Sequence, residues 1–451
     1  MSEYFTLNKK TIVFSYVAQF FQYGIGIIVL PFILKSLQAS DVAIWYIFIA
    51  ISSLAGLIDF GFSQSLSKHV SYVYSGAKIL KVDGCDYSDD NSINLKLLRS
   101  LIFTCRRLYL TIASTIFLTL LTAGTAYLYY TLKKDSSDAN ITDVIIPWAL
   151  YSFTVALNLY YNYVLIFITG QGRISDYNAL VIISKLTYVV SLVTLIYIGC
   201  GLMALVISNL LSAVVLRLMA NHIYLDSNTK RQLVNIEAVP ENLFSIIWPN
   251  AKKFGITNLG VLLFSQSGVF LSGLFLPLEE VAELGITLQL FGILTTLARV
   301  YLSSVCPKIS SLWVKEDYNQ IVNYFIKAQL LCYSIYLTGV FIIVGFGNFI
   351  LQNMIHSNVL LPSTSVLLLY SFFYLMEMTH GNCVTLISTE NKAPYFKAGL
   401  IAGCLSIVVT IVLLLNGSGI LSFPIGLICG SLPYNSWKWP MYVFKRLKRY
   451  E

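Results

Sequence analysis

The chain has 451 residues, of which 57% are hydrophobic and 12% are charged, and it carries a formal net charge of +8. Its mean hydropathy of +0.72 excludes a water-soluble globular fold, because too few charged groups are present for a solvated surface. The composition predicts a polytopic α-helical membrane protein.

Apolar segments recur along the chain, and each is long enough to cross the ~30 Å hydrocarbon core of a bilayer as a helix. The first segment is too long for a signal peptide and is followed by no small-residue cleavage site, so we expect it to be retained. We predict about twelve spans, at residues 11–34, 42–64, 108–132, 144–169, 177–198, 201–222, 245–275, 283–304, 322–350, 362–386, 395–416 and 419–442.

Lysine and arginine gather in alternate loops. If the N-terminus is cytoplasmic, the opposite side keeps only Lys35, Lys133 and Lys134. The positive-inside rule therefore predicts that both termini are cytoplasmic. The basic tail is expected to contact the membrane surface, and the positive charge requires no nucleic acid as a partner.

The eight cysteines are scattered, without a CxxC pattern or a regular spacing. We expect them to fill space between helices rather than to form disulfides or bind a metal.

The sequence contains a candidate internal repeat. An offset of 242 positions between 36–58 and 278–300 places Asp41 over Glu283 and Ile44 over Ile286. We expect two bundles of about six spans each with the same orientation, a parallel repeat of the kind found in many transporters. The alternative is a chance match between two apolar windows. The expected domains are an N-terminal bundle at 1–222, a cytoplasmic linker at 223–244 and a C-terminal bundle at 245–451.

Several short motifs within residues 19–77 belong together. They are QYG at 22–24, Pro31, Asp41 with Trp45, and DFGF at 59–62; TGQGR at 169–173 and ELGIT at 283–287 follow later. The run resembles the opening of Wzx-type O-antigen repeat-unit flippases, in the polysaccharide transporter family of the multidrug/oligosaccharidyl-lipid/polysaccharide exporter superfamily. One departure from the family pattern is the long second loop at 78–107, which is rich in aspartate.

The resemblance implies an all-α fold of two six-helix bundles, similar to MATE exporters, in the bacterial inner membrane. It implies a flippase for undecaprenyl-diphosphate-linked O-antigen or polysaccharide repeat units, working by ion-coupled alternating access in lipopolysaccharide biosynthesis. The implied partners are this lipid-linked oligosaccharide, membrane lipids, the O-antigen polymerase and the chain-length regulator. No cofactor is implied.

Two carboxylates within the spans are candidates for ion coupling. Glu377 lies deep in the tenth span, on one helical face with Tyr374, Gly381 and other residues, and an ionisable group in lipid usually marks a functional site. The alternative for Glu377 is a structural pair with a lysine, and Lys185 is the expected countercharge. Asp59, near the end of the second span, is the other candidate, with capping or pairing to Lys68 as its alternative.

Basic residues within the spans are candidates for attracting an anionic substrate. We expect Lys185, Lys253 and Arg299 to face a shared polar cavity. His380 is expected to form a hydrogen bond between packed helices, with a proton relay as the alternative. Arg217 and Arg299 both lie within reach of the cytoplasmic interface, and Arg217 is explained by snorkelling of its long side chain toward water.

Side-chain amides occur at Asn158 and Asn162 in the fourth span and at Gln22 in the first. Such amides usually join helices through hydrogen bonds. The alternative is a water-filled passage suited to sugar hydroxyls, and we treat all three residues as candidates for substrate binding.

No motif indicates an enzyme, since HExxH, a GxSxG at a strand–helix turn and the Walker A sequence are all missing. Direct coupling to ATP within this chain is therefore not expected. A MATE-like cation-coupled drug exporter is the second hypothesis, and Glu377 favours it. A membrane-embedded polymerase or ligase is disfavoured because the predicted outer loops are short.

Overall fold

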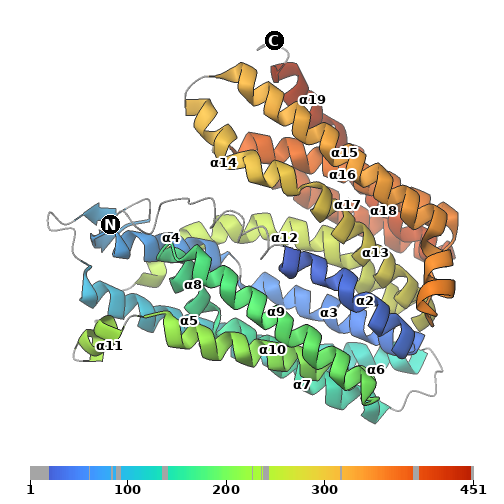
Figure 1. Cartoon of the computed structure of the whole chain (residues 1–451), viewed down its shortest axis with the longest axis horizontal. Helices are drawn as coiled ribbons and strands as arrows, with labels where there is room; N and C mark the ends of the chain where they lie inside the picture. The colour runs from blue at the N-terminus through green and yellow to red at the C-terminus, as the bar shows by residue number, and fades with distance from the viewer. Residues whose placement is uncertain are drawn as a thin grey trace. The chain divides into compact units, whose positions relative to one another are not determined.

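A computed structural model describes residues 20–59, 61–82, 85–87, 93–134, 141–225, 227–234, 236, 243–314, 317–389 and 396–447. Most of these residues are helical (Figure 1). The chain forms two compact units. Unit 1 comprises Met1–Ile25 and Ile51–Asn258, and unit 2 comprises Gly26–Ala50 and Leu259–Glu451. Two helices, α3 (Ala39–Asp59) and α12 (Leu243–Phe275), begin in one unit and end in the other.

Unit 1 is built from helices, most of which are joined by short connections. Besides parts of α3 and α12, it contains α4 (Phe62–Tyr74), α5 (Leu95–Thr119), α6 (Thr125–Lys134), α7 (Ile141–Tyr160), α8 (Asn162–Gly170), α9 (Ile174–Tyr197), α10 (Leu202–Ile223) and α11 (Ser227–Val234). A π-helical turn, Leu120–Gly124, continues α5 into α6, and another is formed by Phe20–Gly24.

A small antiparallel hairpin, β1 (Ala77–Leu80) with β2 (Cys85–Tyr87), lies in the aspartate-rich loop, where the sequence predicted no strand. An exposed ion pair between Lys81 and Asp86 (2.7 Å) joins its two sides.

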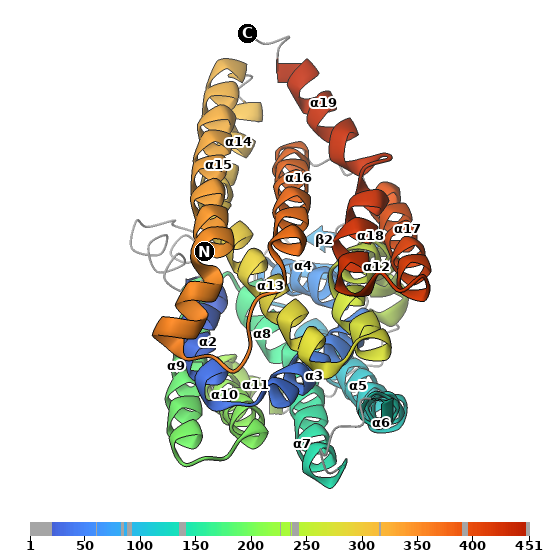
Figure 2. The ribbon, with the colours of Figure 1, turned by 90° about the vertical axis from the view of Figure 1, so that its right-hand side faces the viewer.

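Unit 2 contains the helices of the C-terminal half and nearly all of α2. They are α2 (Ile25–Ser36), α13 (Leu278–Ala298), α14 (Val300–Val314), α15 (Tyr318–Phe349), α16 (Thr364–Ser388), α17 (Phe396–Leu415), α18 (Ser422–Ser431) and α19 (Asn435–Leu447). A π-helical turn, Ile350–Ile355, extends α15, and the 3-10 turn Gly419–Leu421 leads into α18. Helix α16 packs between α15 and α18 (Figure 2) and also contacts α13 and α19.

Every predicted span overlaps helix among the described residues, and positions 11–19, 60 and 395 lie outside them. The spans predicted at 42–64, 144–169, 283–304 and 419–442 are each divided between two helices by a short break. Seven of the described helical segments are long and apolar enough to cross a membrane, and several others are shorter apolar helices. The chain is thus an all-α polytopic membrane protein, as its composition predicts.

The helix boundaries differ from the predicted spans where polar residues extend a helix beyond the apolar stretch. The helical segment predicted at 108–132 begins at Leu95, and the one predicted at 283–304 begins at Leu278 and ends, after a break, at Val314. A hydropathy window cannot detect such ends, because a helix that leaves the bilayer can carry charge on every exposed face. Pro433 lies in the break between α18 and α19, in agreement with the missing N–H of proline.

The two segments that match in sequence also match in local structure. Helices α3 and α13 are both 21 residues long, and after a short break each is followed by a second helix, of 13 residues in α4 and 15 in α14. The two helices begin 239 residues apart, three residues short of the 242-residue offset of the sequence match, so the internal repeat stays a prediction.

Small residues allow α17 and α18 to approach each other closely. Gly426 and Gly430, four residues apart on α18, face Thr410 and Ser406 of α17, and an added Cβ at either glycine would overlap those side chains. In a bilayer, where apolar burial drives no association, this close fit and its dispersion contacts hold the two helices together.

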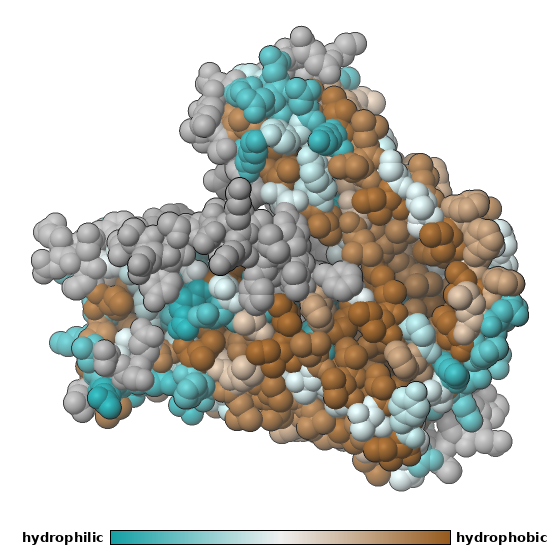
Figure 3. Space-filling view, viewed as in Figure 1, coloured by the Kyte–Doolittle hydropathy of each residue, from teal (hydrophilic) through white to brown (hydrophobic). Residues whose placement is uncertain are grey.

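The outer surface of α9 and α10 is apolar, as Figure 3 shows in brown. Large side chains such as Val190 (65% exposed) and Leu218 (68% exposed) point outward from this pair of helices. In water such a surface would cause aggregation, whereas in a membrane it is the surface that contacts lipid.

Candidate functional site

The strongest candidate site in unit 2 is centred on Arg299, at the break between α13 and α14. Its Nε donates a hydrogen bond to Asn382 Oδ1 (3.0 Å), and its Nη2 donates one to Thr385 Oγ1 (3.1 Å). The guanidinium lies over Gly381 of α16, where an added Cβ would come within 3.3 Å of it. Glycine therefore leaves the space that lets the arginine lie flat against the helix.

The Arg299 network continues through neutral groups only. Asn382 is fully buried and donates from Nδ2 to Gln329 Oε1 (2.9 Å). Gln329 Nε2 donates to Tyr333 OH (2.8 Å), and this hydroxyl shares a hydrogen bond with Thr379 Oγ1 (3.0 Å). Each amide is oriented by its neighbours, so the arginine is held in one position.

Arg299 has no carboxylate within ion-pair distance among the described residues. Its Nη1 likewise has no hydrogen-bond partner among them. Arginine cannot be deprotonated in a protein, so the positive charge remains within the helical bundle. A half-buried cation surrounded by amides and hydroxyls favours the approach of an anion.

Glu377 lies one turn before Gly381 on the same helix. Its Oε1 is 3.3 Å from Nδ1 of His380, and the two side chains are 34% and 13% exposed. His380 Nε2 is buried without a hydrogen-bond partner among the described residues. Tyr374, one turn earlier, lies close enough to Glu377 for the carboxylate charge to act on its hydroxyl group. Its ring stacks on that of Phe291 of α13, with 5.4 Å between the ring centroids. The polar face predicted around Glu377 thus lies against α13.

The expected countercharge for Glu377, Lys185, belongs to unit 1, whereas Glu377 belongs to unit 2. Within unit 2 the partner of Glu377 is His380. Lys185 is half-buried in α9 and has no hydrogen-bond partner among the described residues.

Asp59 ends α3 and accepts two hydrogen bonds from hydroxyl groups. Ser63 Oγ donates to Oδ2 (2.6 Å), and Tyr109 OH donates to Oδ1 (2.8 Å). Asn162, a candidate for substrate binding, donates to Ser63 Oγ (3.0 Å) from the start of α8. The carboxylate is thus held among neutral groups of α4 and α5 in unit 1.

The structure corrects the expectation for Arg217. The predicted snorkelling of this side chain toward water is wrong, because the residue is only 7% exposed. Its Nη2 donates to both the backbone oxygen and Oδ1 of Asn158 (2.9 Å each), and its Nη1 donates to the carbonyl of Tyr161 (3.4 Å). The carbonyl groups of Asn158 and Tyr161 lie at the break between α7 and α8, and the guanidinium donates to both.

The remaining site candidates are placed only in part. Gln22 lies in the π-helical turn before α2, with its side chain exposed. Lys253 lies within α12, and its side chain is outside the described part of the chain. Asn158 and Asn162 both have hydrogen-bond partners inside unit 1, and their contact with a substrate stays a prediction.

Sequence reasoning missed Asn382, Gln329 and Tyr333, which position Arg299. Their signal was the presence of two amides in otherwise apolar spans, since amides in hydrocarbon need partners. The sequence could not show which amide pairs with Arg299, because 83 residues separate Arg299 from Asn382 in the chain.

No family model matches the sequence, and no curated protein matches it. Solved structures do. An inward-facing multidrug resistance MATE family transporter of the MOP superfamily is 13% identical, covering 98% of this chain and 99% of its own, with a TM-score of 0.67. An outward-facing MATE transporter of the same superfamily is 14% identical over 98% and 96%, with a TM-score of 0.55.

A third solved structure is a MOP superfamily transporter from Pyrococcus furiosus, described as having a binding pocket of reverse polarity that suggests a different function. It is 13% identical over 98% and 96% of the two chains, with a TM-score of 0.53. These likenesses show that the chain has the fold of MATE transporters.

Proposed function

We propose that this protein is a transporter, not an enzyme, that flips undecaprenyl-diphosphate-linked O-antigen or polysaccharide repeat units across the bacterial inner membrane. The observation that carries the proposal is Arg299, a cation within the bundle whose hydrogen-bond partners are all neutral. A diphosphate supplies the anionic oxygens that a guanidinium binds best, through two parallel hydrogen bonds.

Leaving an arginine without a countercharge inside a membrane protein is costly, and such residues usually serve function. If Arg299 were structural, a carboxylate partner or full burial against carbonyl groups, as found for Arg217, would be expected. Arg299 instead keeps Nη1 available. In the proposed cycle, Lys185 and Lys253 assist at the headgroup, the amides Asn158, Asn162 and Gln22 meet the glycan, and the lipid tail stays in the bilayer.

Alternating access of two bundles, as predicted from the sequence, would carry the headgroup across. Glu377 and Asp59 are the proposed coupling groups. Moving one charge through 100 mV supplies about 2.3 kcal/mol, so an ion gradient could drive the cycle without nucleotide. His380 beside Glu377 provides a second titratable group at the same site.

The second candidate function is cation-coupled drug export, and Glu377 is the observation that favours it. The Glu377 carboxylate would attract an organic cation, whereas the Arg299 guanidinium would attract an anion. The Pyrococcus furiosus transporter is a precedent within this fold for a binding pocket of reverse polarity, which suggests a different function. We favour the anionic substrate because Arg299 has no carboxylate within ion-pair distance among the described residues.

The test is glycan display in a bacterial strain that lacks its own flippase, with three variants of the full chain at matched abundance. Arg299→Glu should abolish display, Arg299→Lys should retain part of it, and Lys327→Glu, the same reversal at an exposed position on α15, should leave it unchanged. Equal loss in Arg299→Glu and Arg299→Lys would indicate that geometry rather than charge matters. Drug resistance without glycan display would support the second candidate function.

A further inference from the structure

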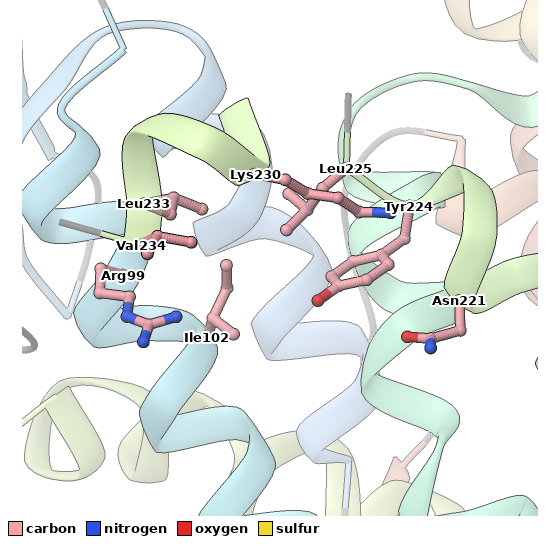
Figure 4. A pocket seen from close by; sticks show the side chains of 8 residues that line it. All are labelled: Arg99, Ile102, Asn221, Tyr224, Leu225, Lys230, Leu233 and Val234. Carbon is pink, nitrogen blue, oxygen red and sulfur yellow. The ribbon is translucent and has the colours of Figure 1, made fainter. Parts of the chain in front are cut away.

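A second basic site lies in unit 1, at the end of the bundle where α5 begins and α10 ends. The short helix α11 folds back over this end and borders an open cavity of about 290 Å³ (Figure 4). Arg99 and Ile102 of α5 form one wall, Asn221 and Tyr224 lie at the end of α10, and Lys230 and Leu233 come from α11. None of these residues belongs to the candidate transport site.

Three features give the cavity its character. Arg99 and Lys230 are both cationic, and none of the described residues that line the cavity is acidic. Tyr224 supplies a hydroxyl donor, and its ring lies 5.8 Å from Lys230 Nζ. Lys230 also donates to the carbonyl of His222 (3.2 Å), which holds its ammonium group at the rim.

A further arginine increases the positive field. Arg106, two turns along α5 from Arg99, donates from Nε to Tyr160 OH (3.1 Å). Burial raises the pKa of Tyr224, and the charges of Arg106 and Arg99 oppose that rise. Both guanidinium groups are therefore close enough to act on the Tyr224 hydroxyl.

Apolar side chains, among them Ile102 and Leu233, also line the cavity. Cationic and hydroxyl donors beside apolar side chains, at the end of a membrane bundle, match an anionic phosphate attached to acyl chains. Free phosphate would use the charges and leave the apolar side chains without a partner.

We propose that this cavity binds the phosphate headgroup of an anionic phospholipid and thereby holds α11 against α5. Arg99 and Lys230 contact the phosphate oxygens, Tyr224 donates a hydrogen bond, and the acyl chains leave along Ile102 and Leu233. The lipid is a resident of the site rather than cargo, so the proposal does not depend on the transported substrate.

The test measures the dissociation constant of short-chain phosphatidylglycerol from the purified full chain in detergent by native mass spectrometry. Phosphatidylcholine and inorganic phosphate are the comparison ligands. Each basic residue near a phosphate contributes about 1 kcal/mol, so Arg99→Gln combined with Lys230→Gln should weaken phosphatidylglycerol binding about 30-fold. The control pair, Lys96→Gln with Arg107→Gln, removes the same charge from exposed positions on α5 and should change binding less than about threefold.

Binding of phosphatidylglycerol that is unchanged in the Arg99 and Lys230 variant, or weakened equally in the control, would overturn the proposal. Inorganic phosphate binding as tightly as phosphatidylglycerol would make the cavity a site for free phosphate, and equal binding of phosphatidylcholine would remove the role of charge. If the double variant does not fold, Lys230→Gln alone should weaken binding about fivefold, and no loss would count against the proposal.

Discussion

Asn382 is the residue through which the Arg299 network is most directly tested. It is fully buried, accepts a hydrogen bond from the guanidinium and donates one to Gln329. Asn382→Leu keeps the branched shape and the number of side-chain heavy atoms and removes both hydrogen bonds. The Nε of Arg299 and the Oε1 of Gln329 would then lose their partners.

The expected cost follows from the two bonds. A hydrogen bond to a charged group contributes about 1.5–3 kcal/mol, and a neutral one about 0.5–1.5 kcal/mol. Hydrogen bonds between membrane helices fall toward the lower end of such ranges, so we expect a loss of about 2–3 kcal/mol in the free energy of unfolding. The assay is equilibrium unfolding of the purified protein in mixed micelles.

Two companion variants separate the network from general disruption. Asn353→Leu, at an exposed position beyond α15, should change the free energy of unfolding by less than about 0.5 kcal/mol. Arg299→Met combined with Asn382→Leu should cost at least about 1 kcal/mol less than the sum of the single changes, because the pair is coupled. Strict additivity of the two changes, or equal destabilisation by Asn353→Leu, would refute the reasoning.

Three further predictions concern coupling, packing and topology. Glu377→Gln should leave protein abundance unchanged and abolish ion-dependent transport, without rescue by a second change at Lys185; normal transport with an unchanged response to the ion gradient would end the coupling hypothesis. Gly430→Leu should destabilise the fold by about 1–3 kcal/mol or more, because the new side chain overlaps with Ser406. Gly345→Ala, with open space around the glycine, should cost less than about 1 kcal/mol. Thermal unfolding of both variants measures these costs. A cysteine at Ser88 should react with an impermeant thiol reagent only after cells are permeabilised, and labelling of intact cells would reverse the predicted orientation.

The sequence by itself determined the class of protein and the order of its helices. The hydrocarbon thickness is a constraint along one dimension, so apolar length in the chain is enough to place each span. The repeat of 36–58 at 278–300 stays a prediction, because α3 and α13 begin 239 rather than 242 residues apart. Helix ends such as Leu95 were not visible, since charged extensions outside the bilayer have no hydropathy signal.

Only the tertiary structure decided which polar groups meet. Arg217 and Arg299 look alike in sequence, as single arginines in apolar helices. In the fold one is buried against the carbonyl and amide of Asn158, and the other keeps part of its guanidinium available beside Asn382. Arg217 and Asn158 are 59 residues apart in the chain, and Arg299 and Asn382 are 83 residues apart. Their pairing depends on how helices rotate against one another, which side-chain packing in three dimensions sets and hydrophobic periodicity does not.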